Sequence, residues 1–142
     1  MPREQMHIGN AAGFSVDRMD VGGPVADSLI ASGKPAALFY ETLAERTLAI
    51  AQRERRANPE KGYTPDLAGF VGPVLKRCVE NGVPIVGNFG AANPMGAAKR
   101  LHALAKTQGI SGLRVAVVDG DDLRENIRGL QTQQWGEEEP LD

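Results

Sequence analysis

The sequence predicts an α/β fold built on a small, open, mostly parallel β-sheet. Short apolar runs typical of buried strands alternate with longer segments in which apolar residues recur every three or four positions, as in helices. Turns rich in glycine and asparagine follow several of these runs. Such alternation favours a parallel sheet with right-handed crossovers. We therefore expect helices on both faces of the sheet, in a three-layer, Rossmann-like arrangement.

The first half of the chain contains two predicted strands and two predicted helices. Residues 6–8 begin the first strand, and residues 35–40 form the second, which has the apolar run of a buried strand. Between them, residues 22–32 form a helix that Gly33 can end. A longer helix follows over residues 41–57. These segments predict the order strand, helix, strand, helix.

The second half continues the alternation. Thr64 and the proline after it begin a helix that runs to the Asn-Gly pair at residues 81–82. Residues 83–88 form the third strand, and Asn93 caps a helix over residues 94–108. Residues 113–118, Leu-Arg-Val-Ala-Val-Val, form the clearest strand of all. The prediction is therefore a sheet of four strands.

The domain organisation follows from where this pattern stops. We assign residues 1–122 to the α/β domain and the polar residues 123–142 to a flexible C-terminal tail. The domain ends just after a strand, with little left to cover the last edge of the sheet. We therefore expect a partner at that edge, either a second copy in a homo-oligomer or a partner subunit.

Composition excludes several classes of protein. The chain has 142 residues, of which 42% are hydrophobic, so it can bury a core without disulfides or metal. A net charge of −2 gives no electrostatic case for nucleic acid or an anionic membrane. No apolar run approaches the roughly 20 residues that span a bilayer, and the first residues lack the apolar region of a signal peptide. With Cys78 as its single cysteine, we expect a cytoplasmic protein.

Residues that follow the strands are the candidate site, because ligands of open parallel sheets bind beyond the carboxyl ends of the strands. The turns after the first and third strands suit an anion, since glycine lets backbone N–H groups approach a ligand and a helix N-terminus attracts negative charge. The candidate anion-binding residues are Gly9, Asn10, Gly13, Asn88, Gly90 and Asn93. The alternative is that these residues only make tight strand-to-helix turns.

Nucleotide and zinc sites lack their usual patterns. There is no G-x-x-x-x-G-K-[ST] sequence, and the turn from Gly9 to Gly13 lacks the G-x-G-x-x-G spacing. The two histidines, His7 and His102, and Cys78 lack the spacing of zinc ligands, and we expect Cys78 to pack in the core. We assign no metal-ligating residue.

Carboxylates follow the second and fourth strands and are the candidate catalytic residues. Glu41 and Asp119 stand directly at strand ends, where they can act as acid and base. The same carboxylates could instead bind a hard cation such as Mg²⁺, so the cofactor is left open. Asp121 and Asp122 suit a helix cap better, and Glu45 suits a solvated helix face.

Four motifs in this order resemble the acyclic terpene utilisation family of bacterial and fungal catabolic proteins. They are IGNAAGF at 8–14, FYETLAERT at 39–47, VGNFGAANP at 86–94 and VAVVDGDD at 115–122. The similarity covers roughly residues 6–122. The sequence departs from the family pattern at Gly90-Ala91, where a second glycine is common. Family members are usually several times longer, so the chain resembles their N-terminal portion.

The resemblance implies a role in the breakdown of acyclic terpenes and related branched acids, a setting in which acyl-CoA enzymes are frequent. One hypothesis is a domain or subunit of an enzyme that acts on a small carboxylate or acyl-CoA, in a hydratase or lyase type of reaction. The competing hypothesis is a non-catalytic α/β binding or assembly module that completes its sheet or site with a partner chain.

Overall fold

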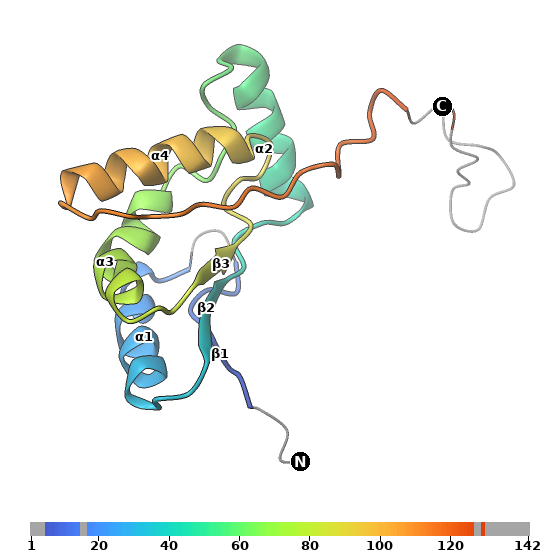
Figure 1. Cartoon of the computed structure of the whole chain (residues 1–142). Helices are drawn as coiled ribbons and strands as arrows, with labels where there is room; N and C mark the ends of the chain where they lie inside the picture. Colours follow the sequence, from blue (N-terminus) through green and yellow to red (C-terminus); the bar gives the residue numbers. More distant parts are fainter. Residues whose placement is uncertain (1–4, 15–16, 127–128, 130–142) are drawn as a thin grey trace, which may run out of the picture.

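Figure 1 shows a computed structural model of the protein, which describes residues 5–14, 17–126 and 129. Within these residues, three parallel strands form an open sheet in the order β1-β2-β3. The predicted class, a small open parallel α/β sheet, is confirmed. The elements are β1 His7–Asn10, the 3₁₀ helix η1 Met19–Val21, α1 Gly22–Ala31, β2 Ala36–Tyr40, α2 Glu45–Ala57, α3 Leu67–Glu80, β3 Ile85–Gly87 and α4 Pro94–Thr107.

The register brings the carboxyl ends of the strands to one edge. Tyr40, the last residue of β2, pairs with Gly87, the last residue of β3. Just beyond β2, the backbone N–H of Glu41 donates to the carbonyl of Ala12 in the turn after β1, at 3.0 Å. The turns that follow all three strands therefore lie at the same edge of the sheet.

One face of the sheet packs against α1, which in turn packs against α3. Each strand is added on the same side of the strand before it, and the connections between parallel strands are right-handed. The helices in these connections therefore lie on the same face of the sheet. Gly9 of β1 shows how close this packing is. A Cβ atom at Gly9 would lie 2.5 Å from Cγ1 of Val25 and 3.0 Å from Cδ1 of Leu29.

Three aromatic rings make the centre of the core. The Tyr40 ring centroid lies 6.0 Å from that of Phe70 and 5.3 Å from that of Phe89. The Tyr40 hydroxyl donates to the Phe70 carbonyl at 3.2 Å, and burial raises the pKa of Tyr40 to about 12. Cys78 is also buried in this core, as predicted. Because Phe89 belongs to the turn after β3, the core holds that turn against β2.

The opposite face of the sheet is less covered than predicted. Ile8 of β1 and Val86 of β3 point away from α1, and they are 70% and 51% exposed. The helices expected on both faces therefore do not cover these two residues. With the strands in the order of the sequence, right-handed crossovers place the connecting helices on one face.

The prediction of a fourth strand at residues 113–118 is wrong. The segment follows α4 in the chain and does not join the sheet (Figure 1). Its backbone makes no hydrogen bond among the described residues. Its side chains still alternate as in a strand: Leu113, Val115 and Val117 are half-buried, and the residues between them are exposed. Strand propensity reflects the fit of side chains to a half-buried surface, and that fit does not require a hydrogen-bonded ladder.

The described part of the chain bears on two further expectations. No described helix combines the length and apolar character needed to cross a membrane. Most of the predicted C-terminal tail, residues 127–128 and 130–142, lies outside the described residues.

Candidate functional site

Glu41 and Asn88 meet at the carboxyl edge of the sheet. The Asn88 side-chain oxygen accepts hydrogen bonds from the Thr42 N–H at 2.8 Å and from the Thr42 hydroxyl at 3.2 Å. The Asn88 side-chain nitrogen donates to Oε1 of Glu41 at 2.8 Å. The same Oε1 accepts the N–H of Leu43 at 2.8 Å. Asn88 is therefore a bridge between β3 and the residues that follow β2.

This arrangement orients the Glu41 carboxylate. One of its oxygens accepts two hydrogen bonds, while Oε2 has no hydrogen-bond partner among the described residues. Glu41 is half-buried, so the second oxygen is not sealed in the core. A carboxylate held in this way can transfer a proton through its unbonded oxygen.

A cleft of about 870 Å³ lies beside Asn88. It opens between β3, α3 and α4 on one side and residues 112–118 on the other. Most of its lining is apolar, and its polar residues include Asn88 and Asp121. Asp121, which sequence analysis placed in a helix cap, is thus a carboxylate that lines the cleft. Examples of its apolar lining are Val71, Leu75, Leu101, Val115 and Val117.

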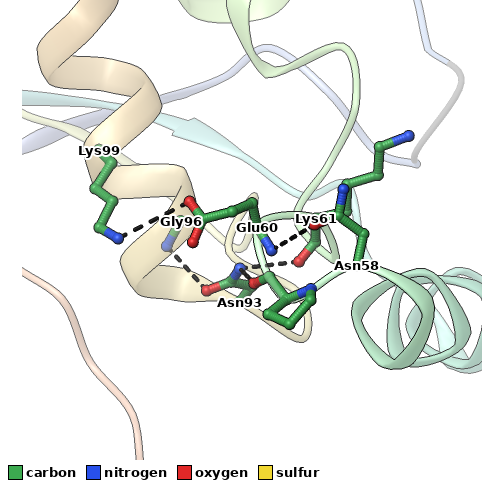
Figure 2. Close-up of polar contacts among 7 residues, drawn as sticks. Asn58, Glu60, Lys61, Asn93, Gly96 and Lys99 are labelled. Carbon is green, nitrogen blue, oxygen red and sulfur yellow. Dashed lines mark hydrogen bonds and ion pairs between the residues drawn. The ribbon is translucent and has the colours of Figure 1, made fainter.

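Asn93 is occupied by its own chain, as Figure 2 shows. Its side-chain oxygen accepts the Gly96 N–H at 2.9 Å, which confirms the predicted cap of α4. Its side-chain nitrogen donates to the carbonyls of Pro59, at 3.0 Å, and Lys61, at 2.8 Å. Because the residue is 7% exposed and both polar atoms have partners, Asn93 attaches the loop before α3 to the start of α4.

The end of β1 and the turn that follows it contain three of the predicted anion-binding residues, in three different environments. Gly9 faces α1 and has a packing role. The Gly13 N–H donates to a carboxylate oxygen of Asp17 at 2.8 Å, and the hydrogen bonds from the N–H groups of Gly13 and Arg18 hold the pKa of Asp17 below its ordinary value. Asn10 is exposed, and its side chain makes no hydrogen bond among the described residues. The turn thus already binds an anion, the carboxylate of Asp17.

Gly90 lies in the turn after β3. A Cβ atom there would lie 2.8 Å from Cα of Pro94, so glycine is needed for the close approach to the start of α4. The Gly90 N–H makes no hydrogen bond among the described residues. The Asn10 side chain and the Gly90 N–H are therefore without a hydrogen-bond partner in the part of the chain that the structure describes.

Asp119 is not brought to the edge by strand pairing. It is exposed, it follows the unpaired segment 113–118, and it makes no hydrogen bond or ion pair among the described residues. Asp122 pairs with Arg124 at 2.5 Å, and this hydrogen-bonded guanidinium lowers the pKa of Asp122 to about 2. Within the described residues, no group of three or more His, Cys, Asp or Glu residues could hold a metal ion.

Fold and site together define an α/β protein with an oriented carboxylate at the carboxyl edge of a parallel sheet. The family model described as "Acyclic terpene utilisation family protein AtuA" matches residues 6–141, and the chain belongs to this family. The resemblance found in the motifs is thus confirmed, and the match continues past residue 122 into the polar C-terminal residues. No curated protein and no solved structure matches the chain.

Proposed function

We propose that the chain works in the cytoplasm as a domain or subunit of a catabolic enzyme. The substrate is a small carboxylate or an acyl-CoA derived from acyclic terpenes or branched acids, and the reaction is of the hydratase or lyase type. Family membership supports acyclic terpene utilisation as the setting. The observation that carries the enzymatic part is the Glu41 carboxylate, held through one oxygen by Asn88 and the Leu43 N–H.

The chemistry assigns Glu41 to proton transfer. Addition of water to a double bond conjugated with a carbonyl places a hydroxyl on one carbon and a proton on its neighbour, and the lyase direction reverses this. Both directions need a group that accepts a proton at one stage and returns it at another. Glu41 can do so through Oε2, while Asn88 keeps Oε1 in place.

The surroundings of Glu41 suggest how a substrate would bind. The apolar cleft beside Asn88 can hold a branched hydrocarbon, and it has a volume of about 870 Å³. The Asn10 side chain and the Gly90 N–H are the candidates for the anionic group, because neither has a partner among the described residues. Asp119 is the second candidate for proton transfer, and its exposed position gives it less support than Glu41.

Glu41→Gln tests this proposal. Glutamine keeps the size of the side chain and an oxygen that can accept the Leu43 N–H, so the fold should persist. Hydration of a 3-methyl-branched, α,β-unsaturated acyl-CoA, followed by loss of the conjugated absorbance, should slow by about 10²- to 10⁴-fold, the usual effect of removing a general acid or base.

Glu45→Gln is the matched control. Glu45 begins α2 only four residues further along, is exposed, and has no part in the Asn88 network. Its substitution should leave turnover unchanged. Equal turnover in the Glu41→Gln variant and the unmodified protein would remove Glu41 from the chemistry.

A non-catalytic assembly module is the second candidate function. It is favoured by the unpaired segment 113–118 and by the exposed apolar residues Ile8 and Val86 on the sheet. Such a module would form a homo-oligomer or bind a partner subunit through these surfaces. Light scattering separates the two functions, because a monomer that turns over substrate contradicts the assembly module.

A further inference from the structure

A second cavity, of about 190 Å³, lies between α2 and the loop that precedes α3. Glu41 and Asn88 are not among its lining residues, but Thr42 and Leu43, which bond to them, are, so the cavity adjoins the site proposed for proton transfer. Its apolar walls include Leu43, Ile50 and Ala51. The polar residues that line it are Thr42, Thr47, Glu54, Tyr63, Thr64 and Asp66.

Thr64 gives the first indication of a ligand. It is only 8% exposed, and its hydroxyl makes no hydrogen bond among the described residues. A threonine before a proline predicts a helix cap, yet α3 begins only at Leu67, whose N–H donates to the Thr64 carbonyl at 3.2 Å. A hydroxyl buried without a partner is destabilising, and a ligand that bonds to it would offset that cost.

The charge of the cavity gives the second indication. Two acidic residues line it, the half-buried Glu54 and the exposed Asp66, and neither forms an ion pair within the part of the chain that the structure describes. No lysine, arginine or histidine is among the lining residues. The lining is mostly apolar and its only charged residues are acidic, so it favours a cation that carries both hydrogen-bond donors and a hydrocarbon part.

The size of the cavity narrows the class of cation. A water molecule takes up about 30 Å³, so 190 Å³ holds a molecule of only a few non-hydrogen atoms. The walls formed by Leu43 and Ile50 suit a short hydrocarbon. We propose that this cavity binds a small organic cation, a primary ammonium group on a short hydrocarbon chain, with the ammonium donating to the Thr64 hydroxyl and to the Glu54 carboxylate.

The binding test uses the full chain and n-propylammonium as the probe. A titration followed by ¹H–¹⁵N NMR should give saturable shifts at the backbone amides of residues that line the cavity, among them Ala51, Tyr63 and Ala91. Thr64→Val and Glu54→Gln should each weaken binding about fivefold or more, as expected for loss of one hydrogen bond to a charged group. Glu45→Gln, on the same helix but outside the cavity, should bind as tightly as the unmodified protein.

Two further measurements separate binding in this cavity from catalysis at Glu41 and from a loss of folding. Glu41→Gln should bind the probe normally, so the cavity can be tested whether or not Glu41 is catalytic. Thr64→Val should be at least as stable as the unmodified protein without probe, because the hydroxyl it removes is buried and has no partner among the described residues. Equal shifts with neutral n-propanol, shifts that do not saturate, or marked destabilisation by Thr64→Val would each overturn the proposal.

Discussion

The turn after β3 and the segment after α4 differ sharply although their sequences look alike. In both places an apolar run, residues 83–86 or residues 113–118, is followed by small and polar residues. In the turn after β3, Asn88 bonds to Thr42 and Glu41, and Asn93 bonds to the loop before α3. In the other segment, residues 113–118 make no backbone hydrogen bond among the described residues, and Asp119 is exposed.

The comparison shows that pairing between strands, more than the strand character of a sequence, places candidate site residues. β3 has only three residues, but its pairing of Gly87 with Tyr40 brings Asn88 next to Glu41. The segment 113–118 has the stronger apolar pattern but no register with β3, so nothing positions Asp119 at the carboxyl edge. Two of the three predictions that follow test how the turn after β3 is held, and one tests the packing of β1; they are given in order of decreasing effect.

Asn93→Ala should loosen the turn after β3 and cause the largest loss of stability. The substitution removes the cap of α4, worth about 1 kcal/mol, and leaves the carbonyls of Pro59 and Lys61 without their donor. We expect the free energy of unfolding to fall by about 3 kcal/mol in urea denaturation.

Asp119→Ala is the matched control from the other segment. Because Asp119 is exposed and without a partner among the described residues, its substitution should change the free energy of unfolding by less than about 0.5 kcal/mol. Equal losses in the two variants would contradict the difference drawn between the two segments.

Gly9→Ala should destabilise the end of β1 by about 2 kcal/mol. The new methyl group would lie 2.5 Å from Cγ1 of Val25, and overpacking of this kind costs about 1–3 kcal/mol. Gly13→Ala, in the turn after β1, should cost far less, since the nearest atom, Oδ2 of Asp17, is 3.9 Å away. Thermal unfolding of both variants measures the contrast, and similar melting temperatures would show that Gly9 is not there for packing.

High pH should weaken the contact between β2 and the turn after β3 through Tyr40. Its pKa is about 12 in the folded protein and about 10 in the unfolded chain, so folding favours the protonated ring. The contribution of the protonated Tyr40 hydroxyl to the free energy of unfolding is fully present below pH 10 and is lost as the pH rises towards 12. At pH 11 the loss in the free energy of unfolding is about 1 kcal/mol.

Tyr40→Phe provides the comparison for this titration. Phenylalanine keeps the contacts with the rings of Phe70 and Phe89 but has no proton to lose. The free energy of unfolding of this variant should therefore fall less steeply between about pH 10 and pH 12. If the free energy of unfolding depends on pH in the same way in the two proteins, the Tyr40 hydroxyl does not contribute to the loss of stability at high pH.

Much of the local structure could be predicted because it depends on neighbours in sequence. The Asn93-Pro94 pair predicted the start of α4 at Pro94, and the apolar spacing predicted α3, although α3 begins at Leu67 and not at Thr64. Glu41 and Asn88 were also found as candidates, because each directly follows a strand. A cap or a helical face is decided within a few residues, so its signal is present in the sequence.

Local patterns were therefore enough to predict the helices, the three paired strands, the family and the carboxylate that follows β2. The three-dimensional packing was needed to show that Asn88 orients Glu41, that Asn93 ties down a loop, and that residues 113–118 stay outside the sheet. The physical reason is separation along the chain. Asn88 and Glu41 are 47 residues apart, and such a contact depends on the packing and register of the whole domain, which no local pattern encodes.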